Sequence, residues 1–154
     1  MMRFIGPADQ DKIRSRFERD LVGQVNLVLF VQPPTGLYIR GREESQTGKQ
    51  ARALMQELTE LSDKIVLEVH NPLAEPEVAQ AYGIERNPAL VIEGAIGKKG
   101  LVRFYGLPSG YEFSTLLEDI VDVSRGTTRL SEAAKQAAAA LPGPLHLQVF
   151  VTPT

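Results

Sequence analysis

Few residues in this sequence could perform nucleophilic, redox or metal chemistry. The 154 residues include no cysteine, which removes disulfides, thiolate nucleophiles and cysteine-ligated metals. The two histidines, His70 and His146, lie far apart, and neither belongs to a ligand spacing such as H-x-x-x-H. A histidine at the end of a strand is therefore a better interpretation of each than a metal ligand. We predict no metal and no cofactor, and we assign no catalytic residue.

Two further patterns resemble functional motifs but lack essential parts. Gly41 and Gly48-Lys49 enclose six residues where a phosphate-binding loop has four, and Gln50 replaces the Ser or Thr that holds magnesium. Glu118 and Asp122 share one face of a predicted helix, but no partner acid, histidine or glycine-rich cradle accompanies them. A polar loop and an exposed acidic helix face are the better interpretations.

The remaining candidate is Asn87-Pro88, which is followed by the short apolar strand 89–92. A proline in this position either begins an edge strand or marks the centre of a binding surface. The residues alone favour the edge strand. Four tyrosines are candidates for lining a groove beside Pro88, although packing in the core or at its rim is the more frequent role of tyrosine: Tyr38, Tyr82, Tyr105 and Tyr111.

Composition and charge describe a globular chain that is long enough for one sizeable core. Its 43% hydrophobic and 23% charged residues are typical of globular domains, and no apolar run approaches the ~20 residues of a membrane span. The formal charge of -2, with mixed signs, argues against a nucleic-acid-binding face. The first residues lack the apolar stretch and cleavage site of a signal peptide. We therefore expect a cytoplasmic protein that binds neither nucleic acid nor membrane.

Hydrophobic periodicity predicts alternating helices and strands. Apolar residues at i, i+4 and i+8 predict a helix over 7–22, and the almost continuous apolar run 25–31 predicts a strand buried on both faces. The prolines in 32–36 cannot continue that strand, so this segment must be a loop. The later elements are predicted in the order helix at about 43–61, strand 64–70, helix 75–82, hairpin with strands 89–92 and 101–105, and a last helix to about 124.

Residues 126–154 repeat the beginning of this pattern. The segment 146–153 aligns with 26–33 at a constant offset of 120, with identities at Leu, Phe, Val and Pro. We therefore predict a helix over 131–141 and a strand over 145–151, the start of a second unit, and divide the chain into domains 1–125 and 126–154. Such a strand would extend this sheet, pair with another chain or belong to a longer protein.

Five segments carry a resemblance to a known family: Phe30-Val31, QELTELSDK at 56–64, YGIERNPA at 82–89, FYGLPSGYEF at 104–113 and LEDIVDVSR at 117–125. They resemble the N-terminal unit of the glutaredoxin-like protein disulfide oxidoreductases of thermophiles, over essentially the whole chain. The resemblance implies an α/β, thioredoxin-like fold with a mixed four- to five-stranded sheet flanked by helices. The helix and strand after residue 126 would then begin a second, truncated thioredoxin-like unit.

The chain departs from this family where the family performs its chemistry. The resemblance places a Cys-x-x-Cys motif just after the first strand, but this chain has a degenerate active-site loop there, with Pro33, Pro34, Thr35 and Gly36. The motif of the second unit would follow Thr154. Dithiol exchange requires a thiolate, and a threonine hydroxyl stays protonated and forms no mixed disulfide. We therefore predict that this chain is inactive on its own.

Pro88 matches the position that is a cis-proline in the family. The resemblance implies a cis Asn87–Pro88 peptide bond and leaves the backbone of Asn87 free to pair with an extended peptide. Asn87 and Pro88 are thus the predicted peptide-binding residues.

Three functions remain open. The first is a non-catalytic module of a thiol-disulfide redox protein, whose partner is a protein or peptide substrate or a redox-active partner unit. The second is a fragment of an active protein disulfide oxidoreductase whose Cys-x-x-Cys lies beyond Thr154. The third is an interaction module that forms a homodimer through the strand 145–151.

Overall fold

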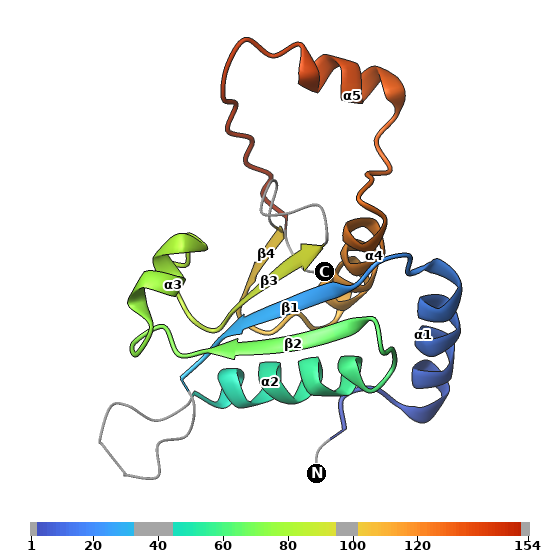
Figure 1. Cartoon of the computed structure of the whole chain (residues 1–154), viewed down its shortest axis with the longest axis vertical. Coiled ribbons are helices and arrows are strands. Elements are labelled where there is room, and N and C mark those ends of the chain that lie inside the picture. The colour runs from blue at the N-terminus through green and yellow to red at the C-terminus, as the bar shows by residue number, and fades with distance from the viewer. Residues whose placement is uncertain (1–2, 33–44, 95–101, 152–154) are drawn as a thin grey trace.

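The structure, a computed structural model, describes residues 3–32, 45–94 and 102–151, and its strands form one mixed sheet (Figure 1). The strands are β1 (Val25–Phe30), β2 (Ile65–His70), β3 (Ala89–Gly94) and β4 (Val102–Tyr105), in the spatial order β2-β1-β3-β4. β1 is parallel to β2 and antiparallel to β3, and β3 is antiparallel to β4. The predicted mixed α/β sheet and its hairpin are confirmed, with four strands in the described residues.

The helices are α1 (Pro7–Asp20), α2 (Gln46–Thr59), α3 (Pro76–Ala81), α4 (Tyr111–Arg125) and α5 (Glu132–Ala139), and the first four cover the two faces of the sheet. Side chains from α1, α2 and α4 form the larger core on one face, while α3 covers the other face with a smaller cluster. Within the three described ranges, no helix has the length and apolar character needed to cross a membrane.

The central strand β1 is buried on both faces, as its apolar sequence predicts. Leu27 and Leu29 point into the larger core, whereas Val28 and Phe30 point into the cluster under α3, and all four are at most 1% exposed. Because side chains alternate along a strand, this double burial fixes the register of β1. It also places Phe30, at the end of β1, on the face that α3 covers.

The predicted bounds of the first two helices are too wide. α1 ends at Asp20 instead of continuing to residue 22, because Leu21 is extended, with φ -76° and ψ 124°. Leu21 is nevertheless buried. An apolar residue at this position therefore indicates packing into the core, and it does not indicate that the helix continues. α2 spans Gln46–Thr59 and not 43–61: the Ser45 hydroxyl accepts a hydrogen bond from the Gly48 N–H, which fixes the first turn.

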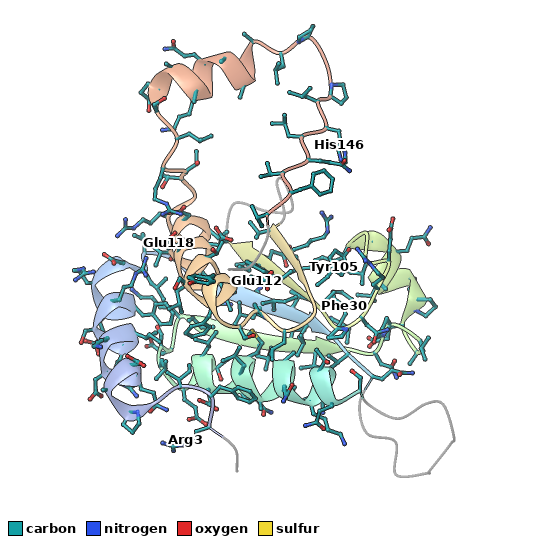
Figure 2. All side chains as sticks on the ribbon, turned by 180° about the vertical axis from the view of Figure 1, so that it is seen from behind. Arg3, Phe30, Tyr105, Glu112, Glu118 and His146 are labelled. Carbon is teal, nitrogen blue, oxygen red and sulfur yellow. The ribbon has the colours of Figure 1, made fainter. Side chains whose placement is uncertain are left out.

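The chain beyond α4 is only partly as predicted. α5 confirms the helix, and its N-cap Ser131 accepts a hydrogen bond from the Ala134 N–H. The prediction of a strand over 145–151 is wrong, since this segment pairs with no strand among the described residues and its side chains are exposed. The cause is physical: apolar alternation suits a strand, but a strand exists only where its backbone groups find a partner. Figure 2 shows His146 on this segment, away from the sheet.

Candidate functional site

The Asn87–Pro88 pair lies between α3 and the start of β3. The peptide bond between the two residues is cis, as the resemblance implies. Pro88 is buried, and its carbonyl oxygen accepts a hydrogen bond of 2.9 Å from the Gly106 N–H just after β4. Asn87 is exposed. The buried proline thus holds an exposed residue at the end of the central hairpin.

The backbone of Asn87 is available for pairing. Within the described residues, neither its N–H nor its C=O forms a hydrogen bond with protein. The backbone is engaged before and after this stretch: the Ile84 N–H donates to Ala79 O at 2.9 Å, the Pro88 carbonyl accepts from Gly106, and β3 begins its ladder at Ala89. A free donor and acceptor at the end of a strand are the groups that strand addition uses.

An open groove begins at Asn87 and runs along α3, with a volume of about 480 Å³. Its lining is mainly apolar, from Pro72, Leu73, Pro76, Ala79 and Ile84, with Gln80, Gly83, Glu85, Arg86 and Asn87 completing it. Leu73 is 61% exposed and contributes apolar surface to the groove. The groove can therefore take an apolar side chain next to the free backbone of Asn87.

An aromatic and acidic cluster joins the strand ends to α3. The Phe30 ring stacks on His70 with 5.5 Å between centroids, and lies 5.6 Å from the Tyr82 ring. The His70 ring nitrogens lie 3.0 Å from a Glu75 carboxylate oxygen and 2.9 Å from one of Glu68. Burial lowers the pKa of His70, but the hydrogen bonds to Glu75 and Glu68 outweigh it and raise that pKa above its ordinary value.

His70 thereby secures the first turn of α3. Glu75, the N-cap residue of α3, accepts from the Asn71 N–H with its second carboxylate oxygen at 3.0 Å. This carboxylate, bound by His70 and by the backbone, has a lowered pKa. Because α3 forms one wall of the groove, the cluster helps to position that wall.

The predicted degenerate active-site loop lies outside the described residues. Pro33, Pro34, Thr35 and Gly36 all fall in the range 33–44. That this loop faces Pro88 stays a prediction. Among the described residues, no group of three or more His, Asp or Glu side chains is arranged to hold a metal ion.

The tyrosines contribute unequally to the site. Tyr82 is buried beneath α3, and Tyr111, 79% exposed, begins α4. Tyr105 lies on the α3 side of the sheet, where its hydroxyl donates to Gly83 O at 3.4 Å (Figure 2). Tyr38 lies outside the described residues.

Sequence reasoning missed Arg86 and the groove along α3. The Arg86 guanidinium carbon lies 5.1 Å from the centroid of the Tyr105 ring, a cation–π contact between residues far apart in the chain. One feature of the sequence could have pointed to Arg86: it is adjacent to Asn87, in the segment 82–89 that supports the family resemblance.

No model of a protein family matches the sequence, and no curated protein matches it. Solved structures match the fold. The NTD_N/C domain of alkylhydroperoxide reductase AhpF from Enterococcus faecalis has a TM-score of 0.73 and 24% identity, over 90% of this chain and 62% of that chain. A protein disulfide oxidoreductase from Aeropyrum pernix has a TM-score of 0.72 and 22% identity, over 92% of this chain and 57% of that chain.

This chain spans about six-tenths of the length of those two structures. Both similarities concern the arrangement of helices and strands, because the sequence identities are low. The chain therefore has the thioredoxin-like fold that its resemblance to protein disulfide oxidoreductases implies, in a sequence without cysteine.

Proposed function

We propose that this chain is a non-catalytic thioredoxin-fold module of a thiol-disulfide redox protein, and that it binds an extended peptide along the backbone of Asn87. The observation that carries the proposal is the exposed Asn87, whose N–H and C=O have no partner in the described residues, at the mouth of an apolar groove. A peptide added there would form backbone hydrogen bonds with Asn87 and place a side chain in the groove.

The absence of cysteine supports a role in binding and not in exchange. Thiol-disulfide exchange begins with thiolate attack on a disulfide sulfur, and these 154 residues supply no thiolate. A redox association is supported by the fold, which is similar to a protein described as an alkylhydroperoxide reductase subunit and to one described as a protein disulfide oxidoreductase. The bound peptide would belong to a protein substrate or to a redox-active partner unit.

The proposal is tested with a fluorescein-labelled, unstructured peptide that has a central leucine flanked by serine and threonine. Anisotropy should rise saturably with protein concentration, and unlabelled peptide should reverse the rise. Asn87→Pro removes the backbone donor and should weaken binding about three- to tenfold, the value of one lost hydrogen bond. Asn87→Ala keeps the backbone and should stay within about twofold of the parent.

Circular dichroism establishes that both variants fold. Equal affinity of parent and Asn87→Pro, or a strong loss with Asn87→Ala, would show that the backbone of Asn87 is not the binding group. An insulin-turbidity assay checks the second half of the proposal: with dithiothreitol present, the chain should precipitate insulin no faster than dithiothreitol alone. Acceleration would contradict a non-catalytic role.

A second role, self-association through 145–151, is favoured by the exposed apolar side chains of that segment: Leu145, Leu147, Val149, Phe150 and Val151. Segments of this kind pair readily with sheet edges, and β2 and β4 are the two edges of this sheet. Light scattering should then show a dimer that Leu147→Asp and Val149→Asp convert to monomer. A monomer at high concentration in the parent chain would exclude this role.

A further inference from the structure

Arg86 is held in a defined place beside Asn87. Its guanidinium lies over the Tyr105 ring, with the guanidinium carbon 5.1 Å from the ring centroid. Tyr105 is itself restrained by its hydroxyl, which contacts Gly83 O at 3.4 Å. Arg86 is exposed, and within the described ranges no carboxylate pairs with it. An arginine that is positioned by an aromatic ring but lacks an acidic partner is available to an acidic ligand.

A second arginine lies on the same face of the sheet. Arg103 and Tyr105 are two residues apart on β4, so their side chains share one face. The Arg103 Nε donates to Tyr82 O at 2.8 Å, and no carboxylate pairs with Arg103 in the described part of the chain. The nearby acids are Glu93, which accepts from the Tyr82 hydroxyl at 3.1 Å, and the exposed Glu85.

The groove and Arg86 meet at Asn87. Both Arg86 and Asn87 line the 480 Å³ groove, whose other walls are mostly apolar. In an extended peptide, neighbouring side chains point to opposite sides, while residues paired across two strands lie about 4.5–5.5 Å apart at Cβ. A peptide paired with Asn87 can therefore place one side chain in the groove and the side chain two residues further along, which points to the same side, near Arg86.

We propose that the peptide bound at Asn87 carries an acidic residue two positions from an apolar one, the apolar side chain filling the groove and the carboxylate pairing with the Arg86 guanidinium. This inference rests on the proposed peptide-binding function. Arginine suits the role because its planar guanidinium binds a carboxylate through two hydrogen bonds. Glu85 opposes the bound carboxylate, so Glu85→Gln should tighten binding of an acidic peptide.

The test uses three labelled peptides that differ only in the residue two positions after the central leucine: Asp, Asn or Lys. The Asp peptide should bind about 1.4- to fivefold more tightly than the Asn peptide, the range of an exposed ion pair, and the Lys peptide should bind most weakly. The preference for the Asp peptide over the Asn peptide should decrease as the salt concentration is raised, because salt screens the charge pair. Arg86→Gln should abolish the preference for the Asp peptide over the Asn peptide, and Arg86→Lys should restore part of that preference.

Arg14→Gln is the matched control, because it removes the same charge from an exposed position on α1 and should keep the Asp preference. Equal affinity for all three peptides, or an equal effect of Arg14→Gln and Arg86→Gln, overturns the inference and leaves the proposed function standing if Asn87→Pro still weakens binding. Preference for the Lys peptide also overturns it. Binding of none of the three peptides overturns the proposed function together with the inference.

Discussion

At the residue scale, the pairing of His70 with Glu75 makes the stability of the fold around the groove depend on the protonation of these two side chains. The pKa of His70 is raised in the folded chain, so charged His70 stabilises the fold below its unfolded pKa, and this contribution is lost as pH rises through the folded pKa. The pKa of Glu75 is lowered, so its contribution is present above the unfolded pKa and is lost as pH falls through the folded value. The pair is therefore most stabilising in mildly acidic solution.

We predict that Glu75→Gln lowers the pKa of His70, because the strongest hydrogen-bond partner of the imidazolium loses its charge. The free energy of unfolding of the parent should exceed that of Glu75→Gln between about pH 5 and 6.5, and the difference should narrow as pH rises above the His70 pKa. NMR titration of the His70 ring and urea denaturation over pH measure both effects. Glu77→Gln, a change at an exposed position on α3 whose side chain forms no ion pair within the described residues, serves as the control. A difference that widens towards alkaline pH would contradict the assignment.

Also at this scale, part of the site could be predicted from sequence and part could not. The cis bond before Pro88 followed from the residues 82–89 that carry the family resemblance. The contact of Arg86 with Tyr105 could not, since it depends on how the start of β3 meets β4 across the hairpin. Local patterns describe neighbours in the chain and not partners brought together by folding.

At the element scale, β3 and α4 approach so closely that only glycine fits at one point. A Cβ on Gly94 would lie 2.7 Å from the Val123 carbonyl oxygen and 2.8 Å from Val123 Cγ1. Those distances are too short for ordinary contact, and the backbone of a packed helix gives way poorly. Gly94 therefore sets the distance between the last helix and the sheet.

We predict that Gly94→Ala destabilises the fold by about 1–3 kcal/mol, because α4 must shift to admit the methyl group. Chemical denaturation followed by circular dichroism measures the change. Gly143→Ala is the control, since a Cβ there meets nothing within 4 Å, and its midpoint should match the parent. Equal midpoints for the two variants would show that β3 and α4 are less tightly packed than described.

Hydrophobic periodicity predicted which helices and strands exist better than it predicted the residues at which they begin and end. The two-sided burial of β1 followed from the apolar run 25–31, because no exposed strand tolerates such a sequence. The same reasoning extended α1 over Leu21 and predicted a strand at 145–151, and both were wrong. Leu21 packs into the core from an extended segment, while 145–151 has the alternation of a strand but no partner in the described structure.

At the scale of the whole molecule, the chain consists of a packed sheet domain and an appended segment. α5 has no buried residue, and it stands apart from the sheet in Figure 1. Besides the backbone bonds of Gly126 and Thr127 to the end of α4, Arg129 links the two parts: its guanidinium binds Glu118 at 2.9 Å and Asp122 at 3.0 Å. Such exposed ion pairs contribute little to stability. The division near residue 125 is therefore our proposal for where the stable unit ends.

We predict that a chain ending at Leu130, which retains Arg129, unfolds at the same denaturant concentration as the full chain. Between residues 131 and 151 the removed part contains no buried residue, so its loss should leave the core unchanged. A chain beginning at Gly6 is the contrasting control: it loses Ile5, which is 3% exposed and whose N–H donates to Glu57 at 3.0 Å. The control should be clearly destabilised. A lower midpoint for the chain ending at Leu130 would mean that 131–151 packs on the sheet domain.

Hydrogen exchange at the Asn87 amide tests the central claim most directly, because this N–H has no protein partner in the described structure. NMR-detected exchange is measured in the free protein and with a saturating concentration of the Asp peptide, with the Ile84 amide, already bonded to Ala79 O, as an internal reference. The account predicts rapid exchange at Asn87 in the free chain and marked slowing when peptide is bound, with Ile84 unchanged. Peptide binding that leaves the Asn87 amide exchanging as fast as before would contradict recognition through its backbone.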